Sequence, residues 1–274
     1  MFNRIFFLVI VFVFINSNFT PAQTNELGIF FGGSLFHGDL GFQNSENAFM
    51  ASRPSFGINI KRNINYYFGL NLSLKRGIIQ AKDSSSEDLF NQNRDLDFRS
   101  SITDLSLLFE FNFQPYSSRD SEYNNSFFVY SGVSRFYFNP QRQSENGFWY
   151  NLRPLNTEGQ GSDFYPGRQP YDLSAFSIPV GIGYKVNIFE YLTLSFHMNW
   201  RFTFTDYLDD VSTSYVEPSV QNPLTLDLSD DLTESYPVGF QRGDPNNFDK
   251  YGFFGISILY SIKDPSKECI DIIK

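Results

Sequence analysis

The strongest constraint on the fold is a run of residues, 192–204, in which apolar and polar side chains alternate. The apolar positions are Leu192, Leu194, Phe196, Met198, Trp200, Phe202 and Phe204. The polar positions between them are Thr193, Ser195, His197, Asn199, Arg201 and Thr203. Successive side chains of a β-strand point to opposite faces, so a period of two predicts a strand with one apolar and one polar face.

The same alternation recurs in seven further segments. It is clearest at 68–75 and 104–113, and it is present near 27–36, 54–61, 127–138, 174–186 and 252–262. An even number of antiparallel strands suits closure into a barrel, so we expect an all-β chain that forms an eight-stranded antiparallel barrel. Pro179 interrupts one segment, and we expect a β-bulge there because proline cannot donate to a strand ladder.

The connections between these strands alternate in length. Compact turns are expected around residues 62–65, 114–125 and 187–190. Long connections are expected at 37–53, 80–98, 139–173 and 205–250. Outer-membrane barrels have short periplasmic turns and longer external loops, so the pattern predicts four long extracellular loops with both termini in the periplasm.

A soluble lipocalin-like barrel also alternates, with its apolar residues inside. Three features favour a transmembrane barrel over that alternative: a charged polar face, loops of unusual length, and aromatic side chains at strand ends, where membrane barrels carry girdles. The chain contains 33 Phe and 16 Tyr in 274 residues. The girdle residues are expected to be Phe68, Phe113, Tyr184 and Tyr260 on the periplasmic side, with Phe138, Phe176, Trp200 and Phe254 on the outer side.

The first residues predict export. Arg4 precedes an apolar stretch, 5–15, and Thr20 and Ala22 then supply small residues for cleavage, so residues 1–23 are expected to be a cleaved signal peptide. The apolar stretch is too short for a spanning helix, which disfavours an uncleaved anchor. Residues 24–262 are then the barrel and 263–274 a short periplasmic tail. The single cysteine, Cys269, excludes an internal disulfide framework. The expected location is the outer membrane, with its lipid as one partner.

The polar face is expected to fill the barrel interior. An eight-stranded barrel is just wide enough for its own side chains, which disfavours a diffusion channel. Buried charges need partners, so we interpret the charged residues of this face as a structural network, and we expect Arg201 to pair with Glu110. The network residues are Lys75, Glu110, Arg135, Lys185 and Arg201.

The sequence offers few candidate catalytic or metal-binding residues. His37 lies near Ser34 and Asp39 at the outer end of one strand, but three common residues this close are a weak signal for a catalytic site. A formal net charge of −9 argues against nucleic-acid binding. Oxygen-rich loops can bind calcium, but no EF-hand spacing is present, and solvated acidic loops are the preferred interpretation. The acidic groups are Asp206, Asp209 and Asp210, followed by Asp230, Asp231 and Glu234. We therefore predict no catalytic residues, cofactor or metal.

Several segments, in chain order, resemble one family. They are Glu26-Leu27-Gly28, Arg99-Ser100, 110–113 (EFNF), Phe138-Asn139-Pro140, 154–161 (PLNTEGQG), 204–216 (FTDYLDDVSTSYV), Gln241-Arg242-Gly243 and Tyr251-Gly252-Phe253. The chain resembles PorG-like outer-membrane proteins along nearly its whole mature length. The loop positions that carry the resemblance best are Thr157, Glu158, Gly159, Gln160, Gly161, Asp206, Tyr207, Asp209 and Asp210.

The resemblance implies a role in protein export. PorG-like proteins are components of the type IX secretion system and associate with a periplasmic ring of PorK and PorN. It therefore implies a non-enzymatic barrel that anchors or contacts PorK/PorN-like ring proteins. The alternative is a free-standing small barrel with a structural or loop-mediated binding role. An enzyme acting on lipid or peptide at the barrel rim is the third possibility.

Overall fold

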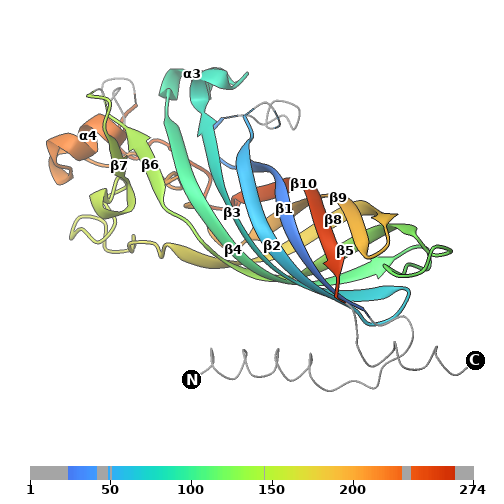
Figure 1. Cartoon of the computed structure of the whole chain (residues 1–274). Helices are drawn as coiled ribbons and strands as arrows, with labels where there is room; N and C mark the ends of the chain where they lie inside the picture. Colours follow the sequence, from blue (N-terminus) through green and yellow to red (C-terminus); the bar gives the residue numbers. More distant parts are fainter. Residues whose placement is uncertain (1–23, 42–48, 50, 145, 230–235, 263–274) are drawn as a thin grey trace, which may run out of the picture.

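The computed structural model describes residues 24–41, 49, 51–144, 146–229 and 236–262 (Figure 1). The predicted signal peptide and the predicted tail, together with the acidic group Asp230, Asp231 and Glu234, lie outside the described residues. No helix among the described residues is long and apolar enough to cross a membrane.

Eight antiparallel strands of the described chain close into one barrel, as predicted. Each strand pairs with its neighbours in the order β3-β2-β1-β10-β9-β8-β5-β4, and the β3–β4 pairing closes the ring. The eight strands are β1 (Thr24–His37), β2 (Arg53–Asn63), β3 (Phe68–Lys82), β4 (Asp97–Asn112), β5 (Asn125–Tyr137), β8 (Ser174–Phe189), β9 (Leu192–Thr203) and β10 (Lys250–Ser261).

The two ends of the barrel differ as the sequence predicts. Short connections lie at one end, which we call the inner end, and the four long connections lie at the other, the outer end. We name the long connections the first to fourth outer loops. They comprise residues 38–52, 83–96, 138–173 and 204–249. By the general rule for outer-membrane barrels, the outer end faces the outside of the cell.

The outer loops carry regular structure that the sequence pattern did not predict. The third loop contains the hairpin β6 (Pro140–Gln143) and β7 (Trp149–Asn151), and β6 continues the sheet by pairing with the outer end of β4. The Arg99 guanidinium lies 3.5 Å above the Trp149 ring and joins the hairpin to β4. The short helical elements are η1 (Asp83–Ser85), α3 (Leu89–Arg94), η2 (Arg153–Leu155), η3 (Pro218–Val220) and α4 (Pro223–Ser229).

Strands β3 and β4 are longer than predicted. The sequence pattern placed residues 80–98 in a loop, but β3 and β4 stay paired as far as Lys82 and Asp97. Figure 1 shows this pair rising beyond the neighbouring strands, with α3 at its tip. Alternation persists here with its phase reversed: the buried side chains are apolar, as in Ile79 and Phe98, and the outward ones are polar. A prediction that relies on outward-facing apolar residues therefore ends both strands too early.

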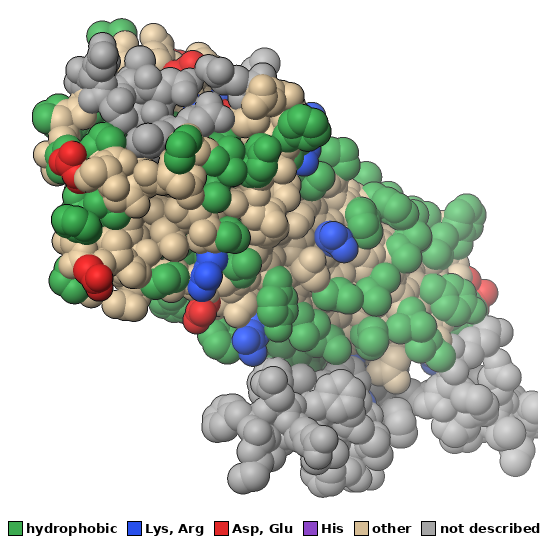
Figure 2. Space-filling view, turned by 90° about the vertical axis from the view of Figure 1, so that its left-hand side faces the viewer, with side chains coloured by type: hydrophobic (Ala, Val, Ile, Leu, Met, Phe, Trp, Pro, Cys, Tyr) green, Lys and Arg blue, Asp and Glu red, His purple; other side chains and the backbone are tan. Residues whose placement is uncertain are grey.

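This reversal divides the barrel wall into two parts. Over most of the wall the outward side chains are apolar, for example Phe31, Ile58 and Phe109, which are 57%, 54% and 48% exposed. Figure 2 shows hydrophobic side chains gathered over this part, whereas at the end with the outer loops they are scattered among other side chains and backbone. An outward apolar band is the surface that a membrane barrel offers to lipid.

Two predictions about residues of the barrel wall were wrong. Arg135 does not point into the lumen: it lies over the outward Tyr137 and Phe176 rings, 5.6 and 5.7 Å from their centroids. Phe138 is not a girdle residue, because it is buried in the apolar core of the outer end. Both errors follow from the reversed phase.

The predicted β-bulge at Pro179 was also wrong. The β5–β8 pairing keeps one register on both sides of it, and the Ser131 hydroxyl donates to the Pro179 carbonyl at 2.9 Å. The register shift of β8 falls instead between Asn187 and Phe189, at the inner end.

The inner part of the lumen is filled by an ion-paired group. Glu110 accepts hydrogen bonds from Lys61, at 2.6 Å, and from Lys185. The Lys185 ammonium also lies 4.2 Å from the centroid of the Tyr116 ring, which the connection between β4 and β5 inserts beneath it. The Tyr116 hydroxyl in turn bonds to Thr193 at 2.6 Å. Tyr116 therefore closes the inner mouth of the barrel.

The outer part of the lumen contains a second ion pair. Arg201 donates from Nε and Nη2 to the two oxygens of Asp104, at 3.0 and 3.1 Å. The Tyr251 hydroxyl donates to the same carboxylate at 2.7 Å. The prediction that Arg201 pairs with Glu110 was therefore wrong. Asp104 and Glu110 share the inward face of β4, and the sequence pattern could not say which one lies level with Arg201.

Between these layers lies a cavity of about 20 Å³, which is large enough for about one water molecule. His197 lines it, as predicted for a histidine in the middle of the lumen, and its ring nitrogens contact the Tyr130 and Ser257 hydroxyls at 3.2 and 3.0 Å. The Lys75 ammonium also lines the cavity and lies 4.0 Å from the centroid of the Phe30 ring. Of the predicted network, Lys75, Glu110, Lys185 and Arg201 lie in the lumen.

Candidate functional site: the outer cap

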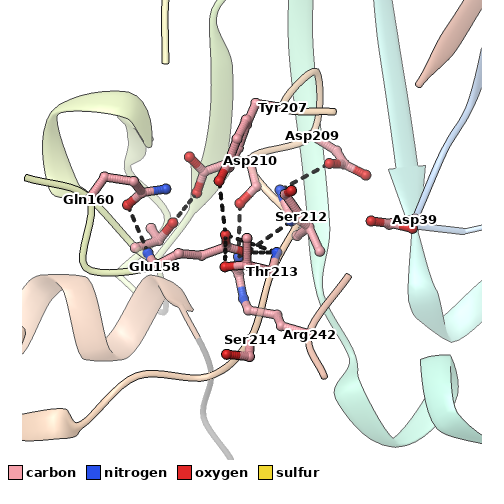
Figure 3. A network of polar contacts seen from close by, with 12 residues as sticks. Asp39, Glu158, Gln160, Tyr207, Asp209, Asp210, Ser212, Thr213, Ser214 and Arg242 are labelled. Carbon is pink, nitrogen blue, oxygen red and sulfur yellow. Dashed lines mark hydrogen bonds and ion pairs between the residues drawn. The ribbon is translucent and has the colours of Figure 1, made fainter. Parts of the chain in front are cut away.

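The outer loops fold over the barrel mouth and form a cap around one buried carboxylate. Glu158, from the third loop, is fully buried, and its Oε1 accepts hydrogen bonds from the Ser212 and Thr213 amides at 2.9 and 3.2 Å. Arg242 donates to the same oxygen at 2.8 Å. The Thr213 hydroxyl and the Tyr207 hydroxyl donate to Oε2 at 2.7 and 3.3 Å (Figure 3). One side chain of the third loop thus organises the fourth.

The turn that presents Glu158 depends on glycine. Gly159 and Gly161 adopt φ angles of +71° and +73°, which L-residues with a side chain rarely adopt. A Cβ atom on Gly159 would also lie 2.8 Å from the Tyr165 ring. Between the two glycines, the Gln160 side chain accepts a hydrogen bond from the Glu158 amide at 3.0 Å. The turn therefore directs both side chains into the cap.

Asp210 supplies a second link between the same two loops. Its carboxylate accepts hydrogen bonds from the Thr157 and Tyr171 hydroxyls, each at 2.5 Å. Its backbone carbonyl accepts one from Arg242 at 2.8 Å, and its φ of +68° places it in the left-handed region. Burial raises the pKa of Asp210 to about 6, opposed mainly by the positive charge of Arg242.

Aromatic rings join the cap to the apolar core of the outer end. The Tyr171 ring stacks on Tyr207 with 4.6 Å between centroids, and it also stacks on Phe138 at 6.2 Å. Tyr171 and Phe138 belong to the main buried cluster together with Leu208 and Val211, and Tyr207 packs against it. The cap is therefore continuous with the barrel interior.

The structure brings together most loop residues that the family resemblance singled out. Thr157, Glu158, Gln160, Tyr207 and Asp210 share one hydrogen-bonded network, and Gly159 and Gly161 shape its turn. Asp206 and Asp209 lie beside this network and are buried, with 5% and 1% of their surface exposed. The interpretation of Asp206, Asp209 and Asp210 as a solvated acidic loop was therefore wrong.

Sequence reasoning missed two cap arginines. Arg242 binds Glu158, and Arg94 donates to Asp83 at 2.6 Å and to the backbone carbonyl of Asp39 at 2.6 Å. Arg242 lies within a segment, Gln241-Arg242-Gly243, that contributed to the resemblance, so its position carried a usable signal. Arg94 lies in α3, a helix too short to show a periodic pattern.

The arrangement of the cap is that of a structural link between loops and not of a catalytic site. Every oxygen of the Glu158 carboxylate is occupied by donors, which leaves it no free position to take a proton from a substrate. Among the described residues, no three His, Cys, Asp or Glu side chains are placed to hold a metal ion together. The rim residues Ser34 and His37 point apart, since Ser34 donates to the Ile78 carbonyl at 2.6 Å while the His37 ring packs against Trp200.

A pocket of about 340 Å³ opens beside the cap. It lies between the first, second and fourth outer loops. Its lining includes His37, Asp39, Asp88, Phe90, Gln241 and Asn247. We call it the rim pocket.

The fold and the filled lumen define a closed, eight-stranded barrel of the outer-membrane type. Within this class, the chain belongs to the family described as "Domain of unknown function (DUF6089)", whose profile matches residues 3–153, more than half of the chain. No curated protein matches the chain in sequence.

Solved outer-membrane barrels resemble the chain in structure. For the attachment invasion locus protein Ail of Yersinia pestis, in complex with sucrose octasulfate, the TM-score is 0.41 at 10% identity, covering 88% of this chain and 99% of Ail. For Neisserial surface protein A the TM-score is 0.40 at 8% identity, covering 88% and 99%. For OprG of Pseudomonas aeruginosa it is 0.41 at 10% identity, covering 87% and 97%.

Proposed function

We propose that the chain is a sealed, non-conducting barrel of the outer membrane that acts through the surfaces at its two ends, as a component of the type IX secretion system. The observation that carries the sealed character is the filled lumen. Tyr116 and the Lys61–Glu110–Lys185 group close the inner part, Arg201 and Asp104 close the outer part, and the cap covers the mouth. A protein without a conducting path must act through its external surfaces.

The secretion role rests on the resemblance to PorG-like proteins. The residues that carry it, Thr157 to Gly161 and the segment 204–216, are the ones that build the cap, so the resemblance concerns a shared structural device and not scattered positions. Partners of the PorK/PorN kind would contact the inner end. A fixed barrel that holds such a ring to the membrane needs rigidity, which the ion-paired lumen supplies.

The test is deletion of the gene combined with complementation. Under the proposal, proteins that bear the type IX sorting domain remain in the periplasm of the deletion strain, and the tagged chain recovers ring proteins from detergent-solubilised membrane. Complementation with Ser34→Ala/His37→Ala/Asp39→Asn should restore export, because these residues form no catalytic group. Normal export in the deletion strain would remove the secretion role.

A free-standing barrel that binds ligands through its loops is the second candidate. The rim pocket favours it, since its volume falls within the range of small-molecule sites and it opens at the outer end. Recovery of the purified barrel without any ring protein, together with normal export after deletion, would support this candidate instead.

A further inference from the structure

Four aspartates form a separate group beneath the cap, and we call them the buried aspartate cluster: Asp39, Asp206, Asp209 and Asp249. The last three are buried, and Asp39 is half-buried at the edge of the group. Asp209 accepts hydrogen bonds from the Leu40 and Val211 amides at 3.2 and 3.0 Å. Asp249 accepts one from the Leu208 amide at 2.9 Å. Figure 3 shows the Asp209 and Asp39 carboxylates facing each other at the edge of the cap.

The cluster ties two outer loops together. Asp209 of the fourth loop holds the first loop at Leu40, and Asp249 touches the same loop at Gly38, where a Cβ atom would lie only 1.9 Å from its Oδ1. Asp39 lies between these two points. The carboxylates therefore sit at the seam where the first and fourth loops meet.

The positive charges around the cluster are already engaged. Arg94 of α3 faces Asp39 and Asp209, but its guanidinium binds both oxygens of Asp83, at 2.6 and 3.0 Å. Arg242 is bound to Glu158. The other charged groups that act on the cluster, Glu158 and Asp244, are negative.

Two members of the cluster have buried oxygens without a hydrogen bond of good geometry. They are both oxygens of Asp206, although the Ser212 side chain lies close, and Oδ1 of Asp249, whose residue is fully buried. A buried charge without a partner is costly, and the usual outcome is that the group takes up a proton. A metal ion is the other way to balance such charge, but no three of these groups are placed to bind one.

We propose that the buried aspartate cluster is a proton-operated latch: protons held by its carboxyl groups keep the first and fourth outer loops together, and their loss loosens the cap. Asp39 also lines the rim pocket, so the cluster exchanges protons with the outside without opening the barrel. The latch concerns the cap alone and does not depend on a role in secretion.

The direction of the effect follows from linkage. Burial raises the pKa of Asp206 to about 8 and that of Asp39 to about 6, and burial also raises the pKa of Asp209 and of Asp249 well above the usual value. The folded cap therefore binds more protons than the unfolded loops. Its stability is greatest below about pH 4, near the ordinary pKa of aspartate, and falls as the pH rises towards about 8.

Hydrogen–deuterium exchange of the folded barrel in detergent tests the latch. We expect the amides of residues 208–213 to exchange faster at pH 8 than at pH 5, after correction for intrinsic rates, by at least roughly tenfold, the ratio that one pKa unit represents. The variant Asp206→Asn/Asp249→Asn removes two charges while leaving an oxygen for the Leu208 amide. It should slow exchange at pH 8 and flatten the pH dependence.

The matched control is Asp163→Asn/Asp172→Asn, which removes two exposed carboxylates of the third loop. It should keep the wild-type pH dependence. The latch proposal is overturned if exchange in the wild type does not change with pH. This measurement does not depend on the folding of any variant. Slow exchange restored at pH 8 by millimolar calcium in the wild type, but not in Asp206→Asn/Asp249→Asn, also overturns it, because a metal ion would then balance the charge.

Discussion

The lipid-facing part of the barrel and its outer end use the same strands and bury the same inward face, but that face is polar in the first part and apolar in the second. In the lipid-facing part, charged residues such as Lys61, Glu110 and Arg201 fill the interior and rings such as Phe109 face outward. At the outer end of β3 and β4, Ile79, Phe98 and Ile102 fill the interior. The outward residues there are mostly polar, with Ile78 as an apolar exception.

The difference shows that the surroundings of a strand, and not its sequence period, decide whether its inward face is polar or apolar. Where lipid surrounds the wall, the polar side chains have only the lumen, and charges there need partners. Where water surrounds the wall, the ordinary hydrophobic effect returns apolar side chains to the interior. The outer end therefore has the arrangement of a soluble barrel, with apolar side chains inside and polar ones outside.

The largest expected effect comes from breaking the lumen pair Arg201–Asp104. Asp104→Ala leaves Arg201 buried without its carboxylate, and breaking a buried pair typically costs about 3–5 kcal/mol. The heat-modifiable gel shift of the barrel should therefore occur at a clearly lower temperature. Asp163→Ala, in an exposed loop, is the control. Equal shifts for both would refute the description of the lumen as ion-paired.

The cap should respond separately from the barrel. Glu158→Gln removes the charge that Arg242 and the loop amides bind, and hydrogen bonds to charged groups are worth about 1.5–3 kcal/mol. Proteolytic cleavage of the fourth loop should accelerate while the heat-modifiable shift stays close to wild type. The exposed Glu217→Gln is the matched control. A loss of the whole barrel in Glu158→Gln would show that cap and wall form one cooperative unit.

The apolar core of the outer end is tested by a pair of identical substitutions. Ile102→Val removes a methylene from a fully buried side chain, which costs about 0.5–1.5 kcal/mol. Ile78→Val makes the same change at an outward position that is 43% exposed. Protease resistance of the outer loops should fall more for Ile102→Val. A larger effect at Ile78 would reverse the assignment of faces.

The smallest effect is expected at Arg135. Because it lies on the outside of the wall against Tyr137 and Phe176, Arg135→Gln should change stability by no more than about 0.5 kcal/mol, as is usual for surface substitutions. The same gel-shift measurement applies. A loss as large as that of Asp104→Ala would place Arg135 in the lumen after all.

The sequence allowed the strands to be placed because lipid and lumen impose a period of two on each of them. It did not allow their outer ends to be placed, since β3 and β4 continue with the phase reversed at Ile79 and Phe98. The ion pairs could not be predicted from the sequence either. Asp104 and Glu110 both face the lumen, and only the tilt of the strands decides which of them lies level with Arg201. Lys61 was missed although alternation with the outward Ile58 and Ile60 places it on the inward face.

The sequence singled out residues of the cap but did not predict the cap itself. The family resemblance singled out Glu158 and Asp210, but spacing alone could not show that residues in two different loops share one network. It also gave no sign that Asp206 and Asp209 are buried, because aspartates in a long loop are usually solvated. Burial there comes from the aromatic core under the cap, which depends on Tyr171 and Phe138 from elsewhere in the chain.

The phase reversal on β3 and β4 fixes the height at which the barrel can sit in the bilayer. Its boundary runs between outward apolar residues such as Phe109 and outward charged ones such as Arg135, Arg99 and Lys82. Sinking deeper would draw these charges into hydrocarbon, at a cost of about 2.5–3.5 kcal/mol each near the centre. Rising would expose apolar side chains at the inner rim to water. One immersion depth of the barrel is therefore favoured, with the cap on the water side of this boundary.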